Sequence, residues 1–218
     1  MSLDSEHGPG DTASDERLLA EYASKRHLYE DFAVAVYRLV DLLVQQTGVR
    51  YQIAYRTKTL VGLREKLARK AAQGTRYQRL ADIEDLAGLR VIFYSERGKR
   101  RCLDAIRDEI SGAMQFEEKK TPSGYDATHI VISFGPKRLQ LSEYKRYEGM
   151  KSEIQVTTVL RHAWSEIEHD LVYKDINGLR RRDSQKFAAM QDRLGDIMER
   201  YIKPASAELE DILNDMDG

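Results

Sequence analysis

The segment from Leu86 to Tyr94, LAGLRVIFY, is a nearly continuous run of apolar residues, and it restricts the folds that this chain can adopt. It is rich in strand formers, and such a run is typical of a strand buried within a sheet. Shorter segments with strand composition, bounded by turn residues, occur at 49–55, 129–134 and 152–156. The sequence therefore predicts a small sheet built around the central segment.

Helical periodicity surrounds these strands. Apolar residues recur at helical spacing from Ser14 to about Thr47, with no Pro or Gly between the first helical turns and the last, which predicts one or two amphipathic helices. Further helices are predicted at 57–73, 99–110, 159–173 and 184–216, the last interrupted at Pro204. This order predicts an α+β (mixed α/β) fold, a small mixed β-sheet flanked by helices, with N- and C-terminal helical extensions.

The chain is expected to divide into three parts. Residues 1–13, MSLDSEHGPGDTA, are small and polar, and we expect them to be disordered or a remnant of cloning. Residues 14–176 would form the main domain, and residues 177–218 a C-terminal helical extension. The terminal helices could build a homo-oligomer, contact a partner, or close on their own domain.

Charge and cysteine content exclude several classes of protein. With 35 basic and 36 acidic residues the net charge is −1, which argues against a general nucleic-acid coat. The single cysteine, Cys102, cannot form an internal disulfide or a multi-cysteine metal site. There is no run of 18 apolar residues and no secretory signal, so we expect a cytoplasmic protein without a membrane partner.

Two carboxylates accompany the predicted strands. Asp85 directly precedes the buried run, and Glu153 lies inside KSEIQV. A carboxylate beside a buried strand is costly unless a cation pairs with it. Two of them on adjacent strands could hold Mg²⁺, which binds a few carboxylates together with phosphate oxygens and waters. Alternatively, Asp85 caps the strand and Glu153 faces solvent.

A basic segment follows the first predicted strand. Lys58, Gly62, Lys66 and Lys70 are four residues apart and share one face of a helix, with Arg56 just before it. A row of cations without an acidic partner between them suits a polyphosphate chain. It could equally be the solvated face of a helix that packs through its leucines.

Two further motifs contain candidate ligand-binding side chains. In TPSGYDATH, Tyr125 could stack on a base and His129 could donate a hydrogen bond to a phosphate, although turn chemistry alone also explains the motif. In the helix 161–174, four side chains on successive turns are of the types that bind zinc: His162, Glu166, His169 and Asp170. Their spacing, however, is not that of the zinc-binding motif HExxH. We expect that helix to pack instead through Ala163, Trp164, Ile167 and Leu171, with Glu166, Glu168 and His169 supporting or lining the site.

The order of these motifs resembles the synthetase domain of the RelA/SpoT homologues, and the chain is similar in size to the stand-alone small alarmone synthetases. The matching strings are RTK···G···K from Arg56, DLAGLRV from Asp85, GYDATH from Gly124, EIQVTT from Glu153 and HAWSEIEHDLVYK from His162. They cover roughly residues 49–174, and their combination is specific.

The resemblance implies a nucleotidyltransferase-like fold that binds ATP and GDP or GTP and transfers the β,γ-pyrophosphate to the ribose 3′-hydroxyl. It makes Asp85 and Glu153 the catalytic pair and the Mg²⁺ ligands, with Glu153 orienting or deprotonating the hydroxyl. It assigns four cations to ATP: Arg56, Lys58, Lys66 and Arg90. It assigns five residues to the acceptor nucleotide: Tyr125, His129, Gln155 and, in place of a basic stretch that the family carries, Lys119 and Lys120.

Some features depart from the family pattern. Gly62 stands where the family often has Ser, and Thr157 where it often has Arg. Asp85 and Arg90 differ by an odd number of positions, so a regular strand would put them on opposite faces. A bend or bulge near 87–88 would then be needed for both to reach one ligand.

Two other functions are compatible with the sequence. The same chemistry could act on the 3′ end of tRNA or on adenosine nucleotides, since the acceptor motifs are altered and Arg180–Arg182 form a basic cluster. A non-catalytic nucleotide-binding module is the third hypothesis, and the intact Asp85 and Glu153 speak against it. No HD-type hydrolase segment is visible, so we expect no alarmone hydrolysis.

Overall fold

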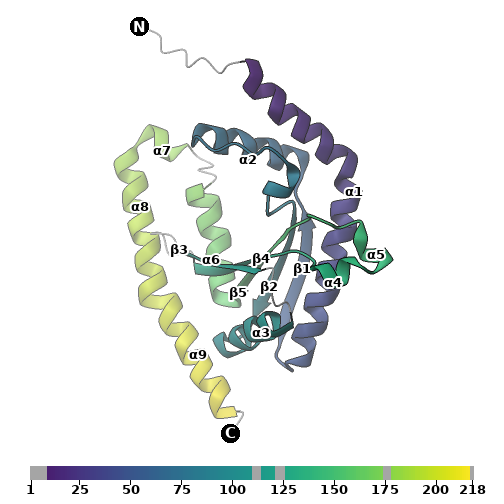
Figure 1. Ribbon diagram of the computed structural model, residues 1–218. Helices are drawn as coiled ribbons and strands as arrows, with labels where there is room; N and C mark the ends of the chain where they lie inside the picture. The colour runs from purple at the N-terminus through teal and green to yellow at the C-terminus, as the bar shows by residue number, and fades with distance from the viewer. Residues whose placement is uncertain (1–8, 110–113, 121–125, 174–177, 217–218) are drawn as a thin grey trace. The chain divides into compact units, whose positions relative to one another are not determined.

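The computed structural model describes residues 9–109, 114–120, 126–173 and 178–216. Within these ranges, five strands form one sheet in the order β1-β2-β5-β4-β3 (Figure 1). The strands are β1 (Tyr51–Thr57), β2 (Ala87–Phe93), β3 (Met114–Lys120), β4 (Asp126–Ile132) and β5 (Ser152–Thr158). Helices precede, separate and follow them, which confirms the α+β fold.

Burial alternates along β2 and along the first residues of β5. In β2 the residues from Ala87 to Phe93 are alternately buried and half-buried, with Gly88 and Arg90 half-buried. Glu153 and Gln155 occupy the equivalent positions in β5. Gly88 lies beside Glu153 and Arg90 beside Gln155, with the same separation in sequence, so the two strands run parallel. Both strands therefore bury one row of side chains and leave Arg90, Glu153 and Gln155 in the other, half-buried row.

The chain folds into two compact units. The first comprises the described residues of Met1–Arg38, Tyr55–Leu89 and Val131–Glu153. The second comprises the described residues of Leu39–Ala54, Arg90–Ile130 and Ile154–Gly218. Each has its own buried apolar side chains.

The first unit contains most of helix α1 (Pro9–Gln46), together with α2 (Leu60–Ala72), the 3₁₀ turn η1 (Leu80–Asp82) and the short helices α4 (Pro136–Leu139) and α5 (Ser142–Lys145). Phe32 of α1 packs its ring against Phe134 and Tyr147, at centroid distances of 5.3 and 5.4 Å. Helix α1 begins at Pro9 rather than at Ser14, and residues 1–8 lie outside the described ranges.

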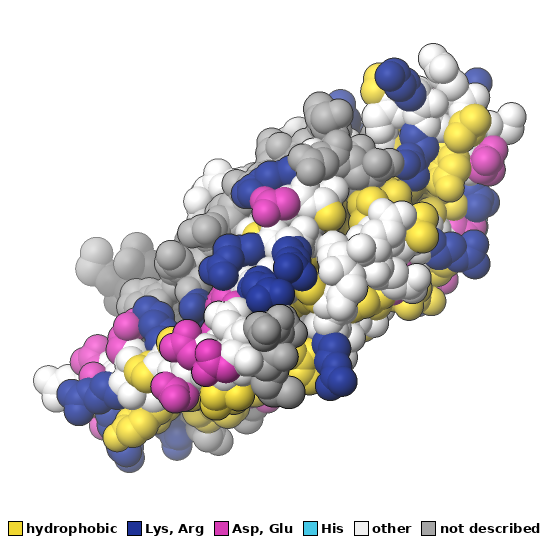
Figure 2. Space-filling model, turned by 90° about the horizontal axis from the view of Figure 1, so that it is seen from below, with side chains coloured by type: hydrophobic (Ala, Val, Ile, Leu, Met, Phe, Trp, Pro, Cys, Tyr) yellow, Lys and Arg dark blue, Asp and Glu magenta, His cyan; other side chains and the backbone are white. Residues whose placement is uncertain are grey.

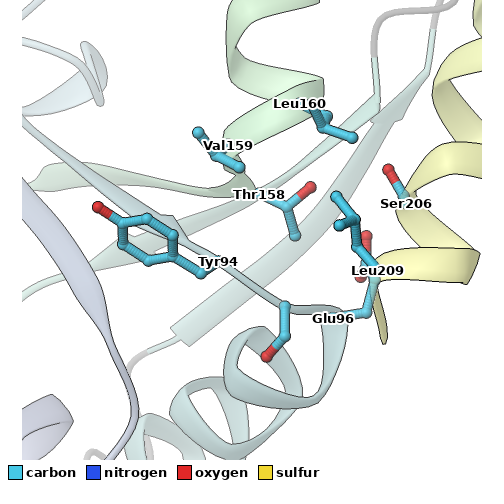
Figure 3. Close-up of a pocket in the computed structure, with 8 residues that line it drawn as sticks. Tyr94, Glu96, Thr158, Val159, Leu160, Ser206 and Leu209 are labelled. Carbon is cyan, nitrogen blue, oxygen red and sulfur yellow. The ribbon is translucent and has the colours of Figure 1, made fainter. Parts of the chain in front are cut away.

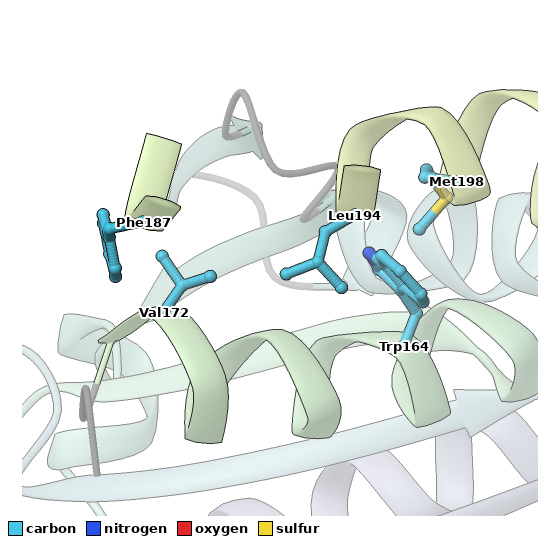
Figure 4. Close-up of a cluster of buried hydrophobic side chains, with 5 residues drawn as sticks. All are labelled: Trp164, Val172, Phe187, Leu194 and Met198. Atoms are coloured by element: carbon cyan, nitrogen blue, oxygen red, sulfur yellow. The ribbon is translucent and has the colours of Figure 1, made fainter. Parts of the chain in front are cut away.

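The second unit contains α3 (Glu96–Glu109), α6 (Val159–Glu168) with its π-helical continuation η2 (His169–Tyr173), α7 (Leu179–Arg182), α8 (Ser184–Ile197), the π-helical turn η3 (Met198–Ile202) and α9 (Lys203–Met216). Its helical core consists of Trp164 and Val172 facing Phe187, Leu194 and Met198 (Figure 4). Of the expected stripe, Trp164 is buried, whereas Ile167 and Leu171 are exposed. The prediction for these two was wrong because the buried face consists of Trp164, Glu168 and Val172, four residues apart, and Ile167 and Leu171 each lie one position before that face.

The structure differs from the sequence-based expectation in the C-terminal helix and in one strand. The C-terminal helix continues past Pro204, but the π-helical turn η3 interrupts its α-helical geometry at Met198–Ile202, just before the proline. The strand β3, MQFEEKK, was missed because its composition is charged, which an edge strand tolerates. In the described part of the chain, no helix has the length and apolarity needed to cross a membrane.

Candidate active site

Asp85 lies in the turn directly before β2. The strand itself begins at Ala87 and runs without interruption to Phe93. The alternation of side chains along the strand therefore does not extend back to Asp85, and β2 contains no bulge at 87–88. The sequence pattern placed the start of the strand slightly too early.

The Asp85 carboxylate forms ion pairs with two lysines. Its Oδ2 lies 2.9 Å from Lys58 Nζ, and its Oδ1 lies 2.7 Å from Lys66 Nζ. All three side chains are at most 25% exposed. Burial by itself raises the pKa of Asp85, but the charges of Lys66 and Lys58 and their hydrogen bonds outweigh it, so the pKa is lowered from 3.8. The carboxylate is therefore ionised at neutral pH, and this Asp85 cluster (Asp85, Lys58, Lys66) carries one surplus positive charge.

The two lysines reach Asp85 from different backbone environments. Lys58 lies between the end of β1 and the N-cap of α2, whereas Lys66 lies within α2, whose Leu63 and Leu67 are buried. Lys66 Nζ also lies 5.7 Å from the centre of the Tyr77 ring. The interpretation of the basic row as lacking an acidic partner was wrong, because the partner comes from a distant turn rather than from the helix.

Gly62 fits the N-terminus of α2 for a steric reason. The Thr59 hydroxyl caps the helix by accepting a hydrogen bond from the Gly62 N–H at 3.0 Å. A Cβ at position 62 would lie 3.1 Å from that same hydroxyl oxygen. A serine here would require the cap to shift slightly.

Arg56 and Glu153 flank Gly88 on the two strands next to β2. A Cβ at Gly88 would lie 3.6 Å from the Glu153 carbonyl oxygen and 3.9 Å from the Arg56 carbonyl oxygen. Arg56 is exposed and Glu153 is half-buried. The first unit thus contains five of the predicted site residues: Arg56, Lys58, Lys66, Asp85 and Glu153.

Arg90 is the centre of a separate group in the second unit. Its Nη1 donates to Glu166 Oε1 at 2.7 Å, and its Nε and Nη2 each donate to Gln155 Oε1 at 3.3 Å. His162 Nδ1 lies 3.8 Å from the same Glu166 oxygen. Burial, followed by the charge of Arg90, lowers the pKa of His162, so the imidazole is neutral at pH 7. We call Arg90, Gln155 and Glu166 the Arg90 group.

Of the predicted acceptor residues, Gln155 belongs to the Arg90 group, whereas His129, Lys119 and Lys120 lie on β4 and β3. His129 is buried in β4, only 5% exposed, and Thr157 is buried in β5. Lys119 and Lys120 are the last residues of β3. Tyr125 lies outside the described residues, so its predicted role remains a prediction.

The arrangement of the described His, Cys, Asp and Glu side chains restricts which kinds of metal site are possible. Over the described ranges, no group of three or more His, Cys, Asp and Glu side chains is placed to hold a metal, which leaves the zinc alternative without a site there. Mg²⁺ does not require such a group, because it binds one or two carboxylates together with substrate phosphates and waters. Asp85 precedes the strand that pairs with the strand of Glu153. Both of its oxygens are paired with lysines, so an ion that arrives with a nucleotide would replace a lysine at one of them.

A small, shallow pocket lies elsewhere in the second unit, lined by Glu96 of α3, Thr158 of β5 and Ser206 of α9 (Figure 3). Glu96 Oε1 lies 3.0 Å from Arg161 Nε. The Glu210 carboxylate accepts hydrogen bonds from the backbone N–H groups of Glu96 and Arg97, at 2.7 and 2.8 Å. These contacts attach α9 to the start of α3, and the pocket contains none of the predicted site residues.

The surface charge agrees with the balanced composition. On the face shown in Figure 2, Lys and Arg side chains are interspersed with Asp and Glu. In the basic cluster of α7, Arg180 donates to the Val172 carbonyl at 3.2 Å and lies 4.8 Å from the Phe187 ring centre. One of the three arginines is therefore engaged in packing.

Comparison with known proteins adds independent information. The family model described as "Region found in RelA / SpoT proteins" matches residues 55–178. The GTP pyrophosphokinase YwaC of Bacillus subtilis (strain 168) is 26% identical over 123 residues, which are 55% of this chain and 56% of YwaC. The chain thus aligns with little more than half of that relative.

Two similar crystal structures are of the small alarmone synthetase 1 from Bacillus subtilis. The form bound to its product pppGpp has a TM-score of 0.64 at 18% identity and covers 93% of this chain and 98% of that chain. The form bound to AMPCPP has a TM-score of 0.63 at 14% identity and covers 91% and 98%. At these identities the structures establish the shared fold.

Proposed function

Because the chain belongs to the RelA/SpoT family, we propose that it is a cytoplasmic, Mg²⁺-dependent GTP pyrophosphokinase. In the reaction, the 3′-hydroxyl oxygen of GDP or GTP bonds to the β-phosphorus of ATP, and the bond from that phosphorus to the α-phosphate breaks. The products are AMP and ppGpp or pppGpp, and the hydroxyl proton is released. Two similarities support this proposal: the relative YwaC is a GTP pyrophosphokinase, and the similar small alarmone synthetase 1 binds pppGpp and AMPCPP.

The observation that carries the proposal is the Asp85 cluster. Transfer of a phosphoryl-type group depends mainly on positioning and on neutralising the charge of the phosphates. The cluster combines an ionised carboxylate with two lysines in a largely buried place, where electrostatic interactions are stronger than in water. In this proposal Lys58 and Lys66 bind the ATP phosphates, and the exposed Arg56 contributes to the same task.

Asp85 and Glu153 are the proposed metal ligands. Mg²⁺ would neutralise charge on the phosphate chain. Glu153 is half-buried, and in this proposal its carboxylate orients the acceptor hydroxyl or takes its proton. A ribose hydroxyl is a poor nucleophile at neutral pH, and a carboxylate within hydrogen-bond reach compensates for that.

The other proposed contacts follow the family motifs. Arg90 would contact ATP from its position between Gln155 and Glu166. Gln155 and His129 would contact the acceptor, together with Lys119 and Lys120 at the end of β3. Tyr125 would stack on the acceptor base, which is worth about 1–3 kcal/mol for an aromatic side chain on a base.

A different acceptor is the second candidate. The exposed Arg181 and Arg182 next to each other in α7 favour an extended anionic acceptor such as the 3′ end of tRNA. Arg180 is engaged with Val172 and Phe187, which reduces the basic cluster available to such an acceptor. We therefore rank the guanine nucleotide first.

One assay tests these alternatives. The protein is incubated with Mg²⁺ and γ-³²P-ATP and, separately, with GDP, GTP, AMP, ADP and deacylated tRNA. We expect label on a guanine nucleotide, and its loss when Mg²⁺ is chelated or when Glu153 is replaced in Glu153→Gln. Label on tRNA or an adenine nucleotide alone would make the second candidate the function. Binding of ATP without label on any acceptor would support the non-catalytic module.

A further inference from the structure

The hydroxyl of Tyr22 links helix α1 to the main chain around the Asp85 cluster. Its oxygen donates a hydrogen bond to the Lys58 carbonyl at 2.7 Å and lies 3.5 Å from the Leu86 carbonyl. The Lys58 N–H in turn donates to that same Leu86 carbonyl at 3.0 Å. Lys58 is one of the two lysines of the cluster, and Leu86 directly follows Asp85. The hydroxyl therefore lies where the two segments that carry the ion pair meet.

The environment of Tyr22 makes its hydroxyl a permanent donor. The side chain is fully buried, at 0% exposure. Burial raises the pKa of Tyr22 to about 12; the charge of Arg26 acts against it, whereas the carboxylates of Glu30 and Asp85 act in the same direction as burial. The phenol thus keeps its proton throughout the physiological range. Its ring packs edge-on against Tyr29, with centroids 5.4 Å apart, so packing restricts the direction of the hydroxyl.

The bond is made at a point where local structure provides little restraint. Lys58 follows the last residue of β1 and precedes Thr59, the N-cap of α2, so it belongs to neither element. Asp85 lies in a turn rather than in β2. Two groups that must stay within hydrogen-bond distance are thus carried by irregular backbone, whose position depends on tertiary contacts. The partly buried Lys58 carbonyl also needs a donor, and Tyr22 provides one.

We propose that Tyr22 is a positioning residue for the ATP side of the site, an inference that rests on the proposed function. Its hydroxyl reinforces the main-chain hydrogen bond between Lys58 and Leu86, so that Lys58 and Asp85 stay in register to receive the phosphates. Tyr22 lies outside the family-matched residues 55–178, so the family match does not assign it a role. The first part of α1 becomes, in this proposal, a component of the nucleotide site.

The matched pair Tyr22→Phe and Tyr29→Phe tests this role. Both variants remove one hydroxyl from a buried tyrosine of α1, about two helical turns apart. For each we would measure KM for ATP, KM for the guanine nucleotide, kcat, the affinity for AMPCPP with Mg²⁺, and the thermal midpoint. We expect Tyr22→Phe to lower kcat/KM for ATP and the AMPCPP affinity by about tenfold each. KM for the guanine nucleotide should stay unchanged, and Tyr29→Phe should resemble the wild type.

A purely structural role for the hydroxyl would give a different result. It would lower the folded fraction and the thermal midpoint without changing the KM for ATP or the AMPCPP affinity of the folded protein, and that result would overturn the proposal. Equal behaviour of the two variants would do the same. The two proposals can also fail separately. If the wild type transfers no label to any acceptor, yet Tyr22→Phe binds AMPCPP more weakly than the wild type does, the proposed function is refuted and the positioning role is supported.

Discussion

The Asp85 cluster and the Arg90 group bring charged side chains together in different ways. In the first, two lysines share one carboxylate, and the side chains are 13–25% exposed. In the second, Arg90 faces the carboxylate of Glu166, which is 56% exposed, and the neutral amide of Gln155. One set carries a surplus positive charge in a largely buried place, whereas the other is balanced and close to solvent.

This difference indicates which set contributes more to binding a polyanion. An ion pair with an exposed partner is worth about 0–1 kcal/mol, because water and salt screen it. Charges that are mostly removed from water interact more strongly, and two like charges held around one opposite charge leave an unmet attraction for an anion. We therefore expect the Asp85 cluster to dominate ATP binding and the Arg90 group to adjust it.

The largest effect is expected from Asp85→Asn. The change leaves the lysines in place but removes the proposed metal ligand, so we expect kcat for pyrophosphate transfer to fall by at least about a hundredfold. Metal-free AMPCPP should bind more tightly than to the wild type, because two lysines then face no carboxylate. Both quantities can be measured with the labelled-ATP assay and by calorimetry.

Asp82→Asn is the matched control for that variant. Asp82 also has a lowered pKa, mainly through its hydrogen bond from the Arg79 side chain, and it lies in the same segment. We expect its kinetics to match the wild type. Near-normal transfer by Asp85→Asn would remove the Asp85 cluster from the catalytic proposal.

An intermediate effect is expected from Lys66→Met. The substitution keeps an unbranched side chain but removes the surplus charge, leaving Lys58 and Asp85 as a balanced pair that resembles the Arg90 group. Hydrogen bonds to charged groups contribute about 1.5–3 kcal/mol, so KM for ATP should rise by at least about tenfold. Steady-state kinetics at saturating guanine nucleotide would measure it.

Lys25→Met provides the comparison for Lys66. Lys25 Nζ also lies 2.7 Å from a carboxylate oxygen, that of Glu21, but both side chains are exposed. We expect no change in KM for ATP. If the two variants had equal KM values, the surplus charge of the Asp85 cluster would have no role in ATP binding.

The smallest effect is expected from Glu166→Gln, which releases Arg90 from its carboxylate. Because the pair is partly exposed, KM for ATP should fall by only about two- to threefold. Glu199→Gln, which removes the carboxylate partner of Lys203, is the control and should leave KM unchanged. A rise in KM on Glu166→Gln would mean that Glu166 holds Arg90 in its productive position, and the contrast between the two regions would then be wrong.

The sequence predicted the elements with strong local signals. The strands β1, β2, β4 and β5 and the main helices lie close to their predicted places, because apolar periodicity and turn residues act over short distances. The charged edge strand β3 lacked that signal. The positioning role of Tyr22 could not be predicted either. In the sequence, a tyrosine that only fills the core side of a helix looks the same as one whose hydroxyl bonds to a distant segment.

The sequence by itself determined the fold class, the family and the kinds of side chain available, because residue type and spacing carry that information. Only the tertiary structure decided which charges meet: that Lys58 and Lys66 share Asp85, that Arg90 is balanced by Glu166, and that Tyr22 reaches the Lys58 carbonyl. These contacts join segments far apart in the chain. Their energies depend on burial and distance, which no local pattern specifies.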